Sequence, residues 1–173
     1  FEVLPTLIVP ALYRSTIKTI PFVPVKEGAL SIYPFDGVGV YYTEKFTSLT
    51  GYDPEIRSSY WQLMDFGFRA YLWGEKITAS QLVKVVYDGN LAPQDTSMHP
   101  DYRRFYLKNI APIFRGDTAH LPWRRCLPYL FKSGEGLKQA WNHFRQARDW
   151  VELYKFRFRL DARQLTELWE DGA

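Results

Sequence analysis

The sequence predicts an all-α domain that follows an extended, proline-rich arm. Apolar residues recur every three or four positions in most segments after residue 40, which is the period of an amphipathic helix. Turn residues separate these segments at lengths typical of stacked helix pairs. Prolines are dense only near the start of the chain. We therefore expect an arm over residues 1–39 and an irregular α-α helical-repeat array over residues 40–173.

The composition is that of one globular domain with many aromatic rings. A chain of 173 residues is long enough to bury a core, and aromatic residues make up 17% of it. These rings either face a partner or remain core and half-exposed rings, and both interpretations stay open. The net charge of +3, with mixed signs along the chain, does not indicate a basic nucleic-acid-binding stripe. The single cysteine, Cys126, excludes an internal disulfide and favours a reducing compartment.

The arm alternates prolines with short apolar runs. Proline at this density prevents a long helix and favours extended segments. The runs are too apolar for a solvated linker, so the arm is expected to cover a surface of this protein or of a partner. The candidate partner-binding residues are Leu7, Ile8, Phe22 and Tyr33. On this interpretation, deleting residues 1–30 weakens assembly and leaves the helical core folded.

A turn and a short helix lead into the repeat domain. Asp36 to Gly39 predicts a turn, and this Gly-x-Gly pair lacks the third glycine and the lysine of phosphate-binding loops. Residues 41–49 then carry Tyr42, Phe46 and Leu49 on one helical face.

The middle of the chain predicts a helical hairpin. Its first helix begins at Asp53, a good N-cap residue, and ends at Gly74, which accepts a left-handed C-terminal conformation. Its second helix begins at Thr78, the first residue of a capping box, and ends at the Asp88-Gly89-Asn90 turn. Two helices joined by so short a turn pack antiparallel.

Further helical segments fill the rest of the chain. His99-Pro100-Asp101 matches the tripeptide of J-domain co-chaperones, but a loop precedes it, so we interpret it as the start of a helix that ends near Arg115, with a kink or an early stop at Pro112. That helix directs Arg103, Arg104 and Lys108 outward. The later helices are expected over 121–131, 135–154 and from Asp161 onward. Residues 154–160 alternate apolar and basic residues as a strand does, but a continued helix or a turn is preferred there.

No catalytic, metal-binding or cofactor-binding constellation is visible. The three histidines, His99, His120 and His143, lie in different segments and not at the spacing of a helical metal pair. Cys126 has no neighbours that would activate a thiol. We therefore expect a non-enzyme with no cofactor. No apolar run approaches the ~20 residues that a membrane span needs.

Nucleic-acid binding is the main functional alternative. The segment Lys155–Arg159 interleaves aromatic and basic residues, as single-strand stacking platforms do. An ordinary amphipathic segment, with apolar residues inward and arginines outward, has the same pattern. Because no consistent basic groove accompanies the segment, nucleic acid is not the expected partner.

The segment from Tyr60 to Pro93 resembles a pentatricopeptide-type unit. Together with the chain length, the helix over 137–151 and the start without Met, it makes the chain similar in architecture to the extra eighteen-kilodalton subunits of the mitochondrial F1-ATPase of euglenozoans. That resemblance implies a non-catalytic structural subunit in the mitochondrial matrix, peripheral to the inner membrane and held by the F1 α subunit. The alternatives are a single-stranded RNA-binding protein and a subunit of another organellar complex.

Overall fold

The computed structural model describes residues 4–15, 19–23, 25–88 and 99–171. Within them the chain forms strands, α-helices, two 3₁₀ turns (η1 and η3) and one π-helical turn (η2). In chain order these are β1 (Leu7–Ser15), β2 (Thr19–Val23), η1 (Phe35–Gly37), β3 (Val40–Tyr41), α1 (Thr43–Ser48), α2 (Ser59–Leu72), β4 (Ile77–Asp88), α3 (Tyr102–Phe105), η2 (Tyr106–Ile110), β5 (Ile113–Arg115), β6 (Thr118–His120), η3 (Trp123–Arg125), α4 (Cys126–Lys132), α5 (Leu137–Tyr154) and α6 (Ala162–Asp171).

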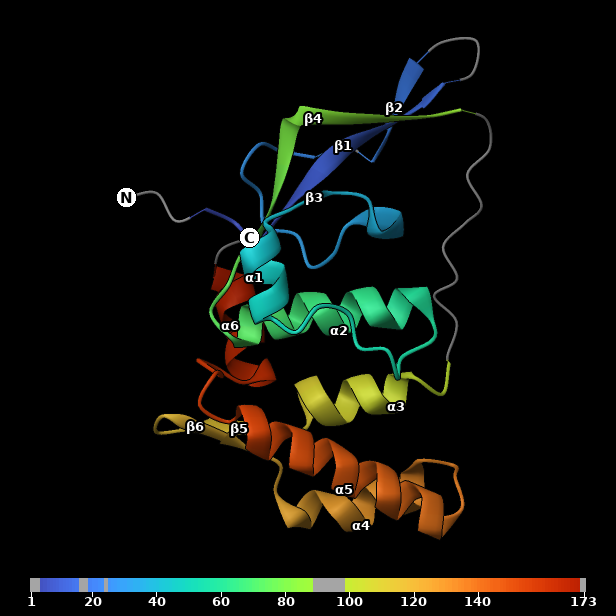
Figure 1. Ribbon diagram of the computed structural model, residues 1–173, viewed down its shortest axis with the longest axis vertical. Helices are drawn as coiled ribbons and strands as arrows, with labels where there is room; N and C mark the ends of the chain where they lie inside the picture. Colours follow the sequence, from blue (N-terminus) through green and yellow to red (C-terminus); the bar gives the residue numbers. More distant parts are fainter. Residues whose placement is uncertain (1–3, 16–18, 24, 89–98, 172–173) are drawn as a thin grey trace.

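A four-stranded mixed sheet is built around β1 (Figure 1). On one side β1 pairs in parallel with β4 over most of its length. On the other side it pairs antiparallel with β3 near its start and with β2 near its end. The first strand of the chain is therefore the centre of the sheet.

β4 changes course halfway along the sheet. Pro10 of β1 stands opposite Ser80, whereas the next residue, Ala11, stands opposite Lys84. Proline has no backbone N–H to donate to the ladder, which favours a bulge at this point. Three residues of β4 are thus passed over, and Figure 1 shows the strand bending sharply. The bend separates a lower part of the sheet from an upper part formed by Ala11–Ser15 and Lys84–Asp88.

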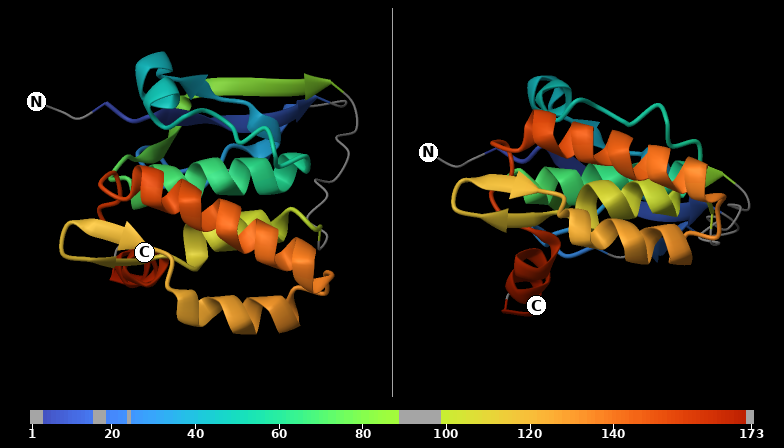
Figure 2. Two further views of the ribbon diagram at one scale, coloured as in Figure 1. Left: turned by 60° about the horizontal axis from the view of Figure 1, so that its bottom comes forward. Right: turned by 90° about the horizontal axis from the view of Figure 1, so that it is seen from below.

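The helices lie in successive layers beneath the sheet (Figures 1 and 2). α2 lies nearest the sheet, then α3 and η2, and then α5 with α4. One buried cluster joins the lower sheet to α2, α5 and α6, and its largest fully buried members are Leu7, Leu49, Phe66, Leu72, Ile77 and Phe158. A second cluster joins η2, α4 and α5 around Phe144. The β5–β6 hairpin projects beside α5.

The predicted all-α, pentatricopeptide-like fold is wrong, because the fold is mixed α/β. The predicted second helix of the hairpin is the strand β4. β-branched residues and tyrosine dominate Val83–Tyr87, and such residues favour a strand when a neighbouring strand is present. β1, about seventy residues earlier, provides that neighbour. The last part of the predicted hairpin, residues 89–93, lies outside the described residues.

Several other element predictions are confirmed or shortened. The C-terminal end of α2 has the expected glycine, with Gly74 at φ 84° and the N–H of Glu75 bonded to the carbonyl of Ala70. The helices α5 and α6 occupy the predicted segments. The helix expected to reach Arg115 ends at Ile110 and is followed by the β5–β6 hairpin. Residues 155–160 form turns, neither helix nor strand.

Candidate ligand-binding site

The four candidate partner-binding residues of the arm lie in three different places. Leu7 is fully buried in the core, and Ile8 beside it on β1 is half-buried. Phe22 lies on β2. Tyr33 is half-buried next to α2, with its ring edge-on to Tyr60 at a centroid distance of 5.8 Å. The structure does not bring these four residues together into one patch.

A cavity of about 640 Å³ opens between α3 and α4. This volume lies within the range of small-molecule sites. The residues of this α3–α4 cavity come from the start of α3, from η2, from η3 and from α4. They are His99, Pro100, Tyr102, Arg103, Tyr106, Arg125, Pro128, Tyr129, Lys132 and Ser133.

The lining combines aromatic rings with cations, and none of the described residues that form it is acidic. Two of the cations have no acidic partner in the described part of the chain. The Arg125 guanidinium donates a hydrogen bond to the Ile110 carbonyl, at 3.4 Å, and Lys132 is exposed at the end of α4. The third, Arg103, is paired with Glu135 at 2.8 Å. The cavity therefore offers positive charge beside flat apolar walls.

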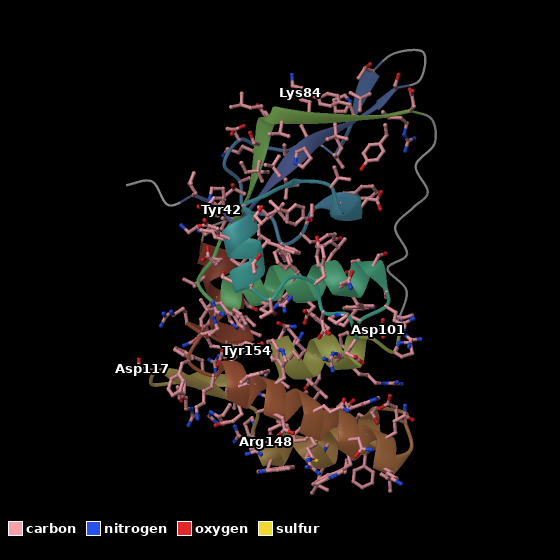
Figure 3. All side chains as sticks on the ribbon, viewed as in Figure 1. Tyr42, Lys84, Asp101, Asp117, Arg148 and Tyr154 are labelled. Atoms are coloured by element: carbon pink, nitrogen blue, oxygen red, sulfur yellow. The ribbon has the colours of Figure 1, made fainter. Side chains whose placement is uncertain are left out.

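Asp101 fixes the start of α3 relative to α2 (Figure 3). Its Oδ2 accepts the backbone N–H groups of Arg57 and Ser58, both at 2.7 Å. These N–H groups lie at the N-terminus of α2 and lack intrahelical partners, so the carboxylate caps that helix from a distant segment. This contact is a structural role for the His99-Pro100-Asp101 tripeptide.

A buried ionic network fixes the position of η2, which contributes Tyr106 to the cavity wall. Lys108 of η2 is fully buried, and its Nζ lies 2.7 Å from Asp53 Oδ2 and 2.9 Å from Asp65 Oδ1. Arg69 pairs with Asp65 at 3.1 Å, one turn along α2. The Lys108 ammonium also lies 4.4 Å from the centroid of the Trp150 ring. Lys108 thus connects η2 to α2, to α5 and to the loop that contains Asp53.

The π-helical turn lets two consecutive residues reach the same carboxylate. The N–H of Ala111 bonds to the carbonyl of Tyr106 at 2.8 Å, which is the five-residue spacing of a π turn. Lys108 and the next residue, Asn109, both donate to Asp65, the latter at 2.8 Å. The turn leaves Tyr106, two residues before Lys108, on the wall of the α3–α4 cavity.

The network keeps both carboxyl groups ionised. Burial alone would raise the pKa of Asp53, but the positive charges of Lys108 and Arg104 outweigh it, so the pKa lies below its usual value. The same balance, with Lys108 and Arg69 as the cations, lowers the pKa of Asp65. The buried charges are therefore matched, which the low polarity of their surroundings requires.

Tyr129, one of the residues that line the cavity, stays neutral. Burial, with the nearby Glu135 charge, raises the pKa of Tyr129 to about 12, against a smaller lowering effect of Arg103. A neutral phenol adds no negative charge that would repel an anion. Burial also raises the pKa of the Cys126 thiol, so Cys126 has the properties of a core residue and not of a nucleophile.

Sequence reasoning missed the cavity and its supporting network. Lys108 was expected to point outward, whereas it is fully buried, and Asp53 binds Lys108 in addition to making a local turn. One signal was present in the sequence. Asp65 and Arg69 stand four residues apart within the apolar stripe of α2, where a charged pair is rare unless it is buried and neutralised.

The described residues contain no group of three or more His, Cys, Asp or Glu side chains placed to bind a metal. Among the helices of the described segments, none combines the length and the apolar character needed to cross a bilayer. No protein-family model matches the chain, and comparisons with curated proteins and with solved structures give no match.

Proposed function

We propose that this protein binds a small anion with a flat apolar body in the α3–α4 cavity. The observation that carries this proposal is the composition of the described lining. It includes no acid, and its cations Arg125 and Lys132, which have no acidic partner among the described residues, stand beside three tyrosines. Arginine and lysine bind carboxylate, sulfonate or phosphate groups through charge-assisted hydrogen bonds. The rings of Tyr102, Tyr106 and Tyr129 provide apolar contact area for the body of the ligand.

Two fluorescent probes that differ by one charged group test this proposal. Anilinonaphthalene sulfonate carries the aromatic body and a sulfonate, whereas phenylnaphthylamine has the same body without the charge. We expect the sulfonate to bind more tightly than the neutral probe in fluorescence titrations. In the double variant Arg125→Gln/Lys132→Gln the affinity for the sulfonate should fall by roughly ten- to a hundredfold.

The control separates this site from non-specific apolar binding. Lys138 is exposed at the start of α5 and does not line the cavity, so Lys138→Gln removes one positive charge elsewhere. That variant, and the neutral probe on every variant, should show nearly unchanged affinity. An equal loss for both probes, or an unchanged sulfonate affinity in the double variant, would contradict the proposal.

A second proposal concerns assembly, and a specific surface supports it. We propose that the chain is a non-catalytic structural subunit of a larger protein complex, docked through the outer face of α4. Leu127 and Phe131, four residues apart on that helix, are 65% and 79% exposed. Neighbouring large apolar side chains on one helical face are typical of a surface covered by a partner. In its finer form, the proposal is that this complex is the mitochondrial F1 head and that the F1 α subunit is the contact. The helical hairpin does not support this finer form, because its second half is the strand β4.

Native purification tests the assembly proposal. Proteins that co-purify in fixed ratio would be identified by mass spectrometry, and Leu127→Ser/Phe131→Ser should release them. Recovery of F1 subunits would support the finer proposal. Recovery with single-stranded RNA, or without any stable partner, would contradict both the assembly proposal and its finer form. Leu153→Ser is the control, because Leu153 is 73% exposed on a different helix, α5.

A further inference from the structure

The upper part of β4 is an open sheet edge. Among the residues that the structure describes, β4 pairs with β1 alone, apart from contacts of residues 27–31 with its first half. The residues Lys84–Asp88, beyond the bend, have β1 on one side and no described strand on the other. An open edge carries N–H and C=O groups that can pair with another strand.

The side chains of this segment alternate strictly. Lys84, Val86 and Asp88 are exposed, and Val85 and Tyr87 between them are half-buried. Figure 3 shows Lys84 on the side of the sheet that faces away from the helices. Lys84 and Asp88 have no ion-pair partner in the described segments, and at four residues apart on an extended strand they cannot reach each other.

The charges of this segment complement a second copy of the same strand. In an antiparallel pair centred on Val86, Lys84 of one copy stands opposite Asp88 of the other, and Val86 stands opposite Val86. By the two-fold symmetry this pair occurs twice. An antiparallel pair centred on Lys84, or a parallel pair in register, would instead place like charges opposite each other, which is unfavourable.

We infer that the protein forms a homodimer in which the two β4 strands pair antiparallel about Val86 and join the two sheets into one. This inference is independent of ligand binding in the α3–α4 cavity. A ladder of five residues per strand is smaller than a standard stable interface, so the dissociation constant is expected to be roughly micromolar. The lysine and the aspartate give the pairing its direction and register.

Charge reversal at the two positions tests the inference. Lys84→Asp places aspartate opposite aspartate, and Asp88→Lys places lysine opposite lysine. Each single variant should raise the dimer dissociation constant by roughly tenfold in sedimentation equilibrium. The double variant Lys84→Asp/Asp88→Lys restores opposite charges across the pair and should recover the wild-type constant. Lys76→Asp, a charge reversal outside this ladder, is the matched control.

A cysteine at the symmetry axis gives a second readout. In the variant Val86→Cys the two thiols face each other across the dimer and should form an intermolecular disulfide under mild oxidation, whereas the buried Cys126 of the wild type should not. A wild-type chain that remains monomeric throughout the accessible concentration range overturns the inference. So does a double variant that fails to recover dimerisation, or an edge that binds only a different protein.

Discussion

The Lys108 ammonium lies between two buried carboxylates, those of Asp53 and Asp65, and pairs with both. In the variant Lys108→Met a side chain of similar length remains, but the charge is lost. We expect this change to lower the free energy of unfolding by roughly 3–5 kcal/mol, because removing one partner leaves buried charge uncompensated. Urea denaturation followed by circular dichroism measures this loss.

The control for this substitution is Lys138→Met on the exposed start of α5. Exposed positions usually change stability by less than about 0.5 kcal/mol. If Lys108→Met lowered the free energy of unfolding no more than Lys138→Met does, the network would not contribute to stability as described.

The same two carboxyl groups predict how stability depends on pH. Both pKa values lie below the ordinary aspartate value of 3.8 in the folded protein, whereas the unfolded chain protonates near that value. As the pH falls below about 5, the unfolded state therefore binds more protons than the folded state, and folding becomes less favourable. Each carboxyl contributes a slope of at most about 1.4 kcal/mol per pH unit.

Urea denaturation at a series of pH values tests this dependence. The wild type should keep its stability from pH 7 to about pH 5 and lose it progressively below. Asp53→Asn should be less stable at neutral pH and should lose less stability on acidification. A variant with the same acid dependence as the wild type would show that Asp53 does not carry this effect.

At the scale of elements, α2 packs directly on the backbone of the segment before η1. A Cβ atom added to Gly67 would lie 1.8 Å from the carbonyl oxygen of Ile32, which is far closer than any real contact. Gly67→Ala must push the helix away from this segment, so we expect a loss of about 2 kcal/mol or more in the free energy of unfolding. Thermal unfolding measures it.

Gly136→Ala is the matched control. Gly136 precedes α5 at φ −61°, and an added Cβ meets nothing within 4 Å. Gly136 is the N-cap of α5, where alanine is less favourable than glycine, so this substitution should cost at most about 1 kcal/mol, less than Gly67→Ala. Equal effects of the two substitutions would contradict the close packing at Gly67.

How far the elements could be predicted depends on where each one finds its contacts. α5 and α6 have a clear apolar period, and α6 also has a local cap, because Asp161 at its start accepts the N–H groups of Arg163 and Gln164. β4 has neither feature within its own segment. Its strand conformation depends on β1, and its apolar residues also fit a helical period, so local patterns alone favoured the wrong element.

The site was hidden for a related reason. The cations of the α3–α4 cavity come from α3, η3 and α4, which are joined only in three dimensions. The lining residues have no fixed spacing in the sequence, so no sequence motif identifies them. Only the charged pair within the apolar face of α2 was a local signal, and it pointed to the supporting network and not to the cavity.

At the scale of the whole molecule, the first strand carries the fold. β1 pairs with all three other strands of the main sheet, and Leu7, Val9 and Leu12 of this strand are buried. The arm was expected to be dispensable for folding of the remainder. Its central position instead predicts that the chain without residues 1–15 loses the sheet and the part of the larger core that the sheet contributes, because β4 then has no partner strand.

We expect the chain without residues 1–15 to unfold without a cooperative transition, while circular dichroism still reports part of the helix. Two point variants measure how much burial of single side chains in this segment contributes to the free energy of unfolding. Leu7→Ala removes a fully buried side chain and should cost about 2–5 kcal/mol. Leu4→Ala, at a position 62% exposed, should cost little. A truncated chain that unfolds cooperatively at the wild-type temperature would contradict this prediction. It would show that the packing of the other helices on α2 is enough for a stable core without the sheet.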